Sequence, residues 1–195
     1  MNCLKKVLLK LAVIIVFISI LSSCTIVPDK DINEENGEQS DNGDIVNLVK
    51  KYWEEEIPDF VSENSVSIEE ALHDDSKKIH CIHDKLIIEE FDDSSQNKCL
   101  IVSDYQNPTL KIQIGPIFKG TALRDGLTFI EADHFKNQIE FASVSSELHK
   151  YLVNEILKEF DPVEVVGKTI DIQGFLYVSN NELMITPTSI SVEGD

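Results

Sequence analysis

TIDIQGFLYVSNNELMIT, at residues 169–186, is the segment that most clearly indicates the fold of this chain. Its first part has the spacing of a strand with one buried face, and Gly174 interrupts that spacing as a β-bulge or bend would. The polar residues 179–181 are typical of a turn, and the apolar run 183–186 predicts a returning strand. The residues expected on the buried face of the first strand are Ile170, Ile172, Leu176 and Val178.

Shorter strand patterns precede this hairpin. Residues 86–91 and 99–102 are apolar runs separated by a polar turn at 92–97. Residues 110–114 alternate apolar and polar side chains, which predicts a half-buried strand that ends at a Gly-Pro pair. Residues 127–130 are expected to be extended as well.

Helical periodicity occurs in three other segments. Residues 45–57 place the only tryptophan, Trp53, on an apolar face where we expect it to be core, and Pro58 is expected to end this helix. A Ser-x-x-Glu capping box predicts a short helix from residue 68, and residues 144–157 predict a longer one. Together these patterns predict an α+β domain, a small OB-like β-barrel with N-terminal and inserted helices.

The first residues of the chain have the features of a secretion signal. Three lysines make the first ten residues positive, and an apolar run follows at 11–18. An uncleaved anchor is the alternative, but the run is too short to cross about 30 Å of hydrocarbon, which needs about 20 apolar residues. The sequence Leu-Ser-Ser-Cys that ends at Cys24 resembles the bacterial lipobox, in which the cysteine is joined to diacylglycerol and the peptide is cut just before it. We therefore expect removal of residues 1–23 and a membrane anchor on Cys24, on the extracytoplasmic face.

Composition indicates a single acidic domain behind a linker. Residues 24–43 are polar and acidic, which predicts a flexible tether, and residues 44–195 are enough for one domain with its own core. Removal of the signal peptide leaves 14 basic and 35 acidic residues, a net charge of −21. This charge repels phosphate backbones, so nucleic acid is not expected as a partner. It is compatible with cations, sugars or a basic protein.

Two segments carry a resemblance to a known family. They are IQIGPIFKGTALRD at 112–125 and FKNQIEFA at 135–142, and the helix around Trp53 and the segments 167–169 and 185–187 agree with it. The chain resembles the predicted periplasmic lipoproteins classed as a bacterial domain of unknown function. The resemblance implies a barrel similar to OB-fold proteins and genes that often lie beside sugar ABC importers of the ribose type. It therefore implies components of a sugar ABC transporter as partners, and it implies no activity.

The glycine-rich segment 115–126 is the candidate ligand site. Its polar side chains could line a pocket in which the Arg124 guanidinium holds a carboxylate or sugar hydroxyls. The alternative, which we favour, is that Arg124 and Asp125 tie the loop to neighbouring polar residues through buried hydrogen bonds. The candidate residues for a ligand site are Lys119, Thr121, Arg124, Asp125, Asn137 and Gln138.

The mature chain contains two cysteines besides the lipidation candidate. An oxidising exterior permits a disulfide between Cys81 and Cys99, and the alternative is two unpaired thiols in adjacent strands or loops. His80, Cys81 and His83 form one tight cluster, whereas zinc sites favour paired ligands from two elements. We expect a solvated loop at 80–83, no metal and no cofactor.

Catalytic signatures are missing from the sequence. It contains no Gly-x-Ser-x-Gly elbow, no His-Glu-x-x-His pair and no cysteine nucleophile with a credible base. The Gly-Lys-Thr at 167–169 lacks the upstream glycine of a phosphate-binding loop. We therefore expect a non-enzymatic binding or accessory module. The alternatives are an envelope hydrolase acting on sugars or peptidoglycan, which requires converging carboxylates in a cleft, and a purely structural envelope protein without a pocket.

Replacing Cys24 by alanine is expected to abolish lipidation, because the thiol is the group that receives the lipid. Mass spectrometry of the protein recovered from membranes should show a diacylglycerol-modified residue 24 as the first residue of the wild type. The variant should keep its leader and gain no acyl mass. A cytosolic wild-type protein with an intact methionine start would contradict the prediction.

Overall fold

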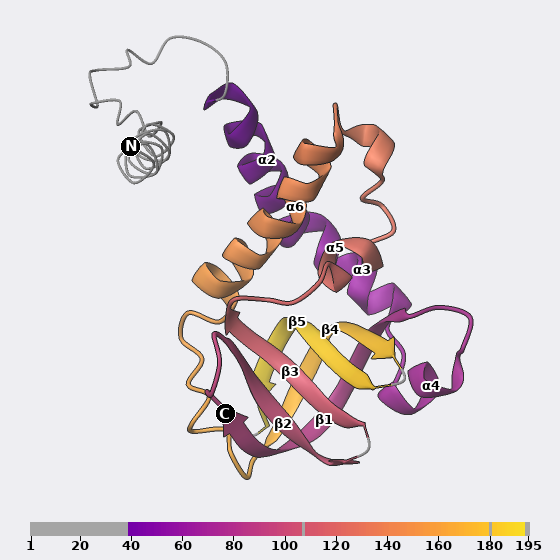
Figure 1. Cartoon of the computed structure of the whole chain (residues 1–195), viewed down its shortest axis with the longest axis vertical. Coiled ribbons are helices and arrows are strands. Elements are labelled where there is room, and N and C mark those ends of the chain that lie inside the picture. The colour runs from indigo at the N-terminus through magenta and orange to yellow at the C-terminus, as the bar shows by residue number, and fades with distance from the viewer. Residues whose placement is uncertain (1–38, 107, 180, 194–195) are drawn as a thin grey trace, which may run out of the picture. The chain divides into compact units, whose positions relative to one another are not determined.

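The computed structural model describes residues 39–106, 108–179 and 181–193. In this part of the chain a closed barrel of five strands lies below a layer of helices in the view of Figure 1. The signal peptide, Cys24 and the tether up to residue 38 fall outside the described residues, and residues 39–43 belong to the first helix. No helix of the described part is both long enough and apolar enough to span a bilayer.

The strands follow the order β1-β2-β3-β5-β4 around the barrel. Neighbouring strands run antiparallel except β3 and β5, which are parallel and close the barrel where residues 110–112 pair with 183–185. This closed barrel with helices confirms the predicted fold class. The strands are β1 Ile79–Asp92, β2 Asn97–Gln106, β3 Thr109–Pro116, β4 Thr169–Ser179 and β5 Glu182–Val192.

The helices are placed before the barrel and between β3 and β4. α6 begins where the side chain of Asn137 accepts the first free N–H groups, and it continues into a π-helical turn, so the predicted helix at 144–157 is confirmed. The predicted N-cap at Ser67 is confirmed too, because the Ser67 hydroxyl accepts from the Glu70 N–H at 3.2 Å. The helical elements are α2 Gln39–Lys51, η1 Tyr52–Glu56, α3 Ile57–Asn64, α4 Ile68–His73, α5 Ala122–Gly126, η2 Ala132–His134, α6 Gln138–Tyr151 and η3 Leu152–Ile156.

The first helix does not end at Pro58, so that prediction is wrong. The chain passes from α2 through the π-helical turn η1 directly into α3. The N–H of Ile57 bonds to the carbonyl of Tyr52, five residues back, and Pro58 then stands in the first turn of α3. Proline is tolerated there because the π-helical turn just before it changes the local hydrogen-bond pattern, and the helix continues past a residue that has no N–H to donate.

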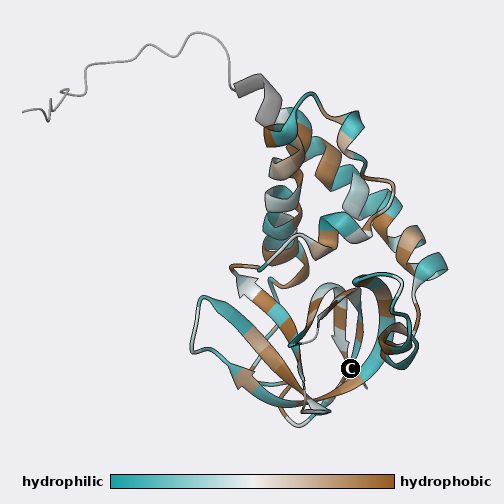
Figure 2. Ribbon diagram, turned by 45° about the vertical axis from the view of Figure 1, so that its right-hand side comes forward, coloured by the Kyte–Doolittle hydropathy of each residue, from teal (hydrophilic) through white to brown (hydrophobic). Residues whose placement is uncertain are grey.

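Two apolar cores hold the structure together. One lies between the helices and the barrel, and it contains Trp53, which stacks on Tyr151 with ring centroids 5.4 Å apart. The prediction that Trp53 is core is therefore confirmed. The other core fills the barrel. Successive residues of β1 pack into different cores, since Cys81 belongs to the core below the helices and Ile82 to the core inside the barrel. Figure 2 shows brown and teal alternating along the strands.

Three strand predictions need correction. β1 starts at Ile79 rather than near residue 86, so residues 80–83 form part of a strand and not a solvated loop. β2 also extends beyond its predicted apolar run, to Gln106. Residues 127–130 are not a strand, because the Ile130 N–H bonds back to the Leu127 carbonyl in a turn. In each case the backbone pairing available in the fold sets the element boundary, and local apolar content does not.

The predicted bulge at Gly174 is confirmed. The pairing register between β4 and β5 shifts between Gln173 and Gly174, and Gly174 then lies opposite Pro187. A Cβ on Gly174 would lie 2.4 Å from the carbonyl oxygen of Thr186 and 2.8 Å from the Cα of Pro187. The absence of a side chain lets the two strands approach closely where the barrel bends.

The variant Gly174→Ala is expected to lower the free energy of unfolding by about 1–3 kcal/mol, because backbone atoms would have to move to admit the methyl group. Urea unfolding of the purified protein measures this change. Gly43→Ala is the matched control, since its Cβ would meet nothing within 4 Å in an exposed helical turn. An unfolding midpoint for Gly174→Ala equal to that of the wild type would contradict the close approach.

Candidate functional site

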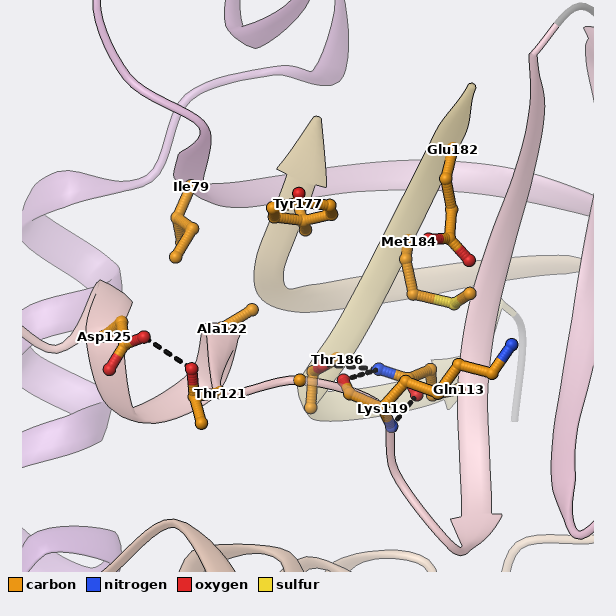
Figure 3. A pocket seen from close by; sticks show the side chains of 11 residues that line it. Ile79, Gln113, Lys119, Thr121, Ala122, Asp125, Tyr177, Glu182, Met184 and Thr186 are labelled. Atoms are coloured by element: carbon orange, nitrogen blue, oxygen red, sulfur yellow. Dashed lines mark hydrogen bonds between the residues drawn. The ribbon is translucent and has the colours of Figure 1, made fainter. Parts of the chain in front are cut away.

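A cavity of about 330 Å³ lies between the β3–α5 connection and strands β4 and β5 (Figure 3). Its walls combine apolar side chains with charged and hydroxyl groups from separate parts of the chain. The lining residues are Ile79, Gln113, Lys119, Gly120, Thr121, Ala122, Asp125, Tyr177, Glu182, Met184 and Thr186. Three of the predicted site residues, Lys119, Thr121 and Asp125, are therefore brought together here.

The side chain of Gln113 fixes the wall formed by the β3–α5 connection. It is fully buried, and its oxygen accepts from the Lys119 N–H at 2.6 Å and from the Asn97 side chain at 2.8 Å. Its nitrogen donates to the Thr186 hydroxyl at 3.0 Å and to the Lys119 carbonyl at 3.3 Å. Both ends of the amide are thus used, and one side chain joins β2, β3, β5 and the connection. Figure 3 shows its bonds to Lys119 and Thr186.

Asp125 has its charge compensated within the protein. Its carboxylate accepts two hydrogen bonds from the Arg124 guanidinium, at 2.8 and 2.6 Å, and one from the Thr121 hydroxyl at 2.5 Å. Figure 3 shows Asp125 directed at Thr121. This pairing anchors the short helix α5 at the edge of the cavity.

Arg124 does not line the cavity, and it serves the fold. Its side chain is 12% exposed, its guanidinium carbon lies 4.0 Å from the ring centroid of Phe141, and it donates to the Phe141 carbonyl at 3.4 Å. Asn137 caps α6 by accepting from the N–H groups of Ile139 and Glu140, both at 2.9 Å. Gln138 is exposed on the first turn of that helix. The structure therefore assigns three candidate ligand-binding residues, Arg124, Asn137 and Gln138, to loop anchoring and helix capping or to the surface.

Three polar side chains of the cavity have no partner within the described part of the chain. They are Lys119, Tyr177 and Glu182, whose ammonium, hydroxyl and carboxylate groups make no hydrogen bond or ion pair there. Lys119 is exposed, and the other two are half-buried. Of the three, the sequence pointed only to Lys119. Tyr177 and Glu182 belong to the β4–β5 hairpin, where the sequence pattern predicts ordinary strand residues. No local sequence feature marks either of them as a site residue.

A stacked pair of rings joins the β3–α5 connection to α6. Phe118 lies on His149 with ring centroids 4.9 Å apart. Burial lowers the pKa of His149 to about 4, so its imidazole is neutral at physiological pH. A neutral ring stacks on Phe118 without the cost of desolvating a charge.

Cys81 and Cys99 are free, buried cysteines, so the disulfide alternative is not realised in the structure. The pairing register explains this, because Cys99 lies opposite Asp92 at the far end of β1 from Cys81. A disulfide needs Cα atoms within about 7 Å. Burial raises the pKa of the Cys81 thiol to about 11, which leaves it protonated and unreactive.

The histidines of the 80–83 segment do not form a metal site with Cys81. His80 is 1% exposed and its Nε2 lies 3.1 Å from the Lys77 carbonyl oxygen, while His83 points outward and bonds to Asp171 at 2.9 Å. Within the described residues, the one cluster with suitable spacing for a cation is Glu131, Asp133 and His134, and all three are exposed. Exposed acidic groups of this kind are common without an ion.

Comparison with solved structures defines the class of protein. The chain is similar to an OB-fold protein from Thermotoga maritima, with a TM-score of 0.58, 14% identity, and coverage of 76% of this chain and 98% of that one. At this identity the likeness shows the fold alone, and it agrees with the five-stranded barrel. The protein is thus an OB-fold barrel with added helices.

The family is shown by sequence. Residues 73–191 match the family described as predicted periplasmic lipoprotein (DUF2291), and because this is more than half of the chain, the chain belongs to that family. The resemblance of the segments at 112–125 and 135–142 is therefore confirmed. No curated protein matches the chain. The setting beside sugar importers stays a prediction.

Replacing Gln113 by leucine is expected to lower the free energy of unfolding by about 1–3 kcal/mol and to loosen the cavity wall, because the Lys119 N–H and the Asn97 amide lose a buried acceptor. Hydrogen exchange of the Lys119 amide, followed by NMR, should become faster than in the wild type. Gln173→Leu on β4, at a half-buried site, is the control and should leave that amide unchanged. Equal exchange rates in all three proteins would show that Gln113 does not hold the connection.

Proposed function

We propose that this protein is a lipid-anchored module on the extracytoplasmic face of a membrane, and that it binds a small polar solute without transforming it. The family of predicted periplasmic lipoproteins supports the location. The sequence ending at Cys24 supports the lipid anchor, and the acidic segment before the barrel would separate the domain from the bilayer.

The observation that carries the binding role is the cavity between the β3–α5 connection and the β4–β5 hairpin. It has the size of a small metabolite, an apolar side with polar groups at its edge, and a wall held in place by the buried Gln113. Lys119, Tyr177 and Glu182 have no partner in the described part of the chain, so their polar groups are available to a solute. A wall that is already fixed avoids the cost of ordering a loop when the solute binds.

A non-enzymatic role agrees with the carboxyl groups at the cavity. Hydrolysis of a glycoside requires two converging carboxyl groups, one of which carries a raised pKa. Here Asp125 is engaged by Arg124 and Thr121, so its carboxylate is not available as the partner of Glu182 in such a pair (Figure 3). Among the described carboxyl groups with a resolved shift, Asp74 and Asp92, the pKa is lowered by hydrogen bonds to serine.

We further propose a transport setting, in which the protein assists an ABC importer of the sugar type. The support for this setting is the family resemblance alone. Affinity purification of the full-length lipoprotein from detergent-solubilised membranes tests it, with the Cys24→Ala variant as control. Recovery of importer subunits with the wild type would support the setting, and recovery of none would count against it.

Filling the cavity is expected to abolish solute binding. Lys119→Trp places a large ring at an exposed position of the wall while keeping the backbone N–H that bonds to Gln113. Isothermal titration of the full-length protein in nanodiscs, with panels of monosaccharides and amino acids, should detect a ligand for the wild type and none for the variant. Lys158→Trp, exposed and away from the cavity lining, is the matched control. A ligand that binds both proteins equally would contradict the assignment of the cavity.

A further inference from the structure

The charges around the cavity are arranged as a separated pair. Lys119, in the β3–α5 connection, and Glu182, at the start of β5, carry opposite charges, and within the described residues neither forms an ion pair. Asp125, the third charge of the lining, is already compensated by Arg124. The cavity therefore presents one free positive and one free negative group, and their sum is zero.

Both free charges belong to the lining of the same cavity. Figure 3 shows the two side chains on the same side of the cavity, away from Thr121 and Asp125. A single small molecule could therefore contact both.

The signs of these charges select a dipolar solute. An anion would gain from Lys119 but would be repelled by Glu182 and by the net charge of −18 of the chain. A cation would gain from Glu182 and be repelled by Lys119. A neutral polyol would make hydrogen bonds without compensating either charge, whereas a molecule with an ammonium and a carboxylate would make a charge-assisted hydrogen bond at each end.

The remaining walls favour an apolar substituent on that solute. Ile79, Ala122 and Met184 line the cavity beside the polar groups, and Tyr177 lies between Ile79 and Glu182 in Figure 3. Methionine adapts to side chains of varied shape because it is unbranched and polarisable. A volume of about 330 Å³ accommodates an amino acid with a side chain of medium size.

We propose that the cavity binds a zwitterion, a free α-amino acid with an apolar side chain, whose carboxylate meets Lys119 and whose ammonium meets Glu182. This inference rests on the proposed solute-binding function and specifies the class of solute. The Tyr177 hydroxyl adds a polar contact at the edge, and the apolar walls receive the side chain of the amino acid.

Isothermal titration of the full-length protein in nanodiscs tests the inference. The probes are L-leucine and L-methionine as zwitterions, isovalerate as the matching anion, isopentylamine as the matching cation, and D-ribose and D-glucose as neutral polyols. The zwitterions should bind at least tenfold more tightly than the anion and the cation, and Lys119→Gln and Glu182→Gln should each weaken them about tenfold, as loss of a charged hydrogen-bond partner does. Lys158→Gln and Glu159→Gln, exposed and outside the lining, are the charge-matched controls and should bind as the wild type does.

The outcomes separate this inference from the function on which it rests. Binding of a sugar, with loss in Lys119→Trp, would keep the solute-binding function and overturn the zwitterion. Zwitterion binding that is equal in the cavity variants and the control variants would also overturn it. Binding of none of the probes by a folded wild-type protein would overturn both proposals.

Discussion

The barrel closes through a short contact between β3 and β5, and the side chain of Gln113 extends that contact. Backbone pairing joins residues 110–112 with 183–185. At the next position along both strands, the Gln113 amide donates to the Thr186 hydroxyl. Since Gln113 is fully buried, a polar group left without its partner there would cost about 1–3 kcal/mol. The connection after β3, and with it the cavity wall, is held by this constraint.

The same part of the chain links the barrel to the helices. β3 ends at a turn in which Gly115 has a φ of 72°, a region that favours glycine, and a Cβ there would lie 2.8 Å from the Phe118 ring. The turn directs Phe118 onto His149 of α6, while Gln113 holds the backbone of Lys119 on the barrel. The helices and the barrel thus fix the two ends of one short segment, which limits how far the cavity wall can move.

Much of the fold could be predicted from local patterns, and the errors have a common cause. The alternation around Gly174 predicted the hairpin and its bulge because one buried face repeats every second residue. The start of β1 was missed because residues 80–82 are all buried, with Cys81 in one core and Ile82 in the other, which removes the alternation. Pro58 does not end the helix because a preceding π-helical turn, which has no sequence signature of its own, lets the helix continue past it.

The candidate site was only partly predictable, for a related reason. The glycine-rich segment pointed to Lys119, Thr121 and Asp125, since polar residues in a turn are expected near a surface. Gln113 was expected to face solvent from a half-buried strand, yet it is buried because the connection folds back over it. Local sequence cannot show that return of the chain.

Glu182, near the end of the sequence, is a second site residue that local sequence does not reveal. It begins β5, more than sixty residues after Lys119. Parallel pairing sets the start of β5 beside the start of β3, and the β3–α5 connection returns over Gln113 beside Thr186, so that Lys119 and Glu182 line one cavity. The charge pattern of the site is therefore a property of barrel closure, and no single segment of the sequence contains it.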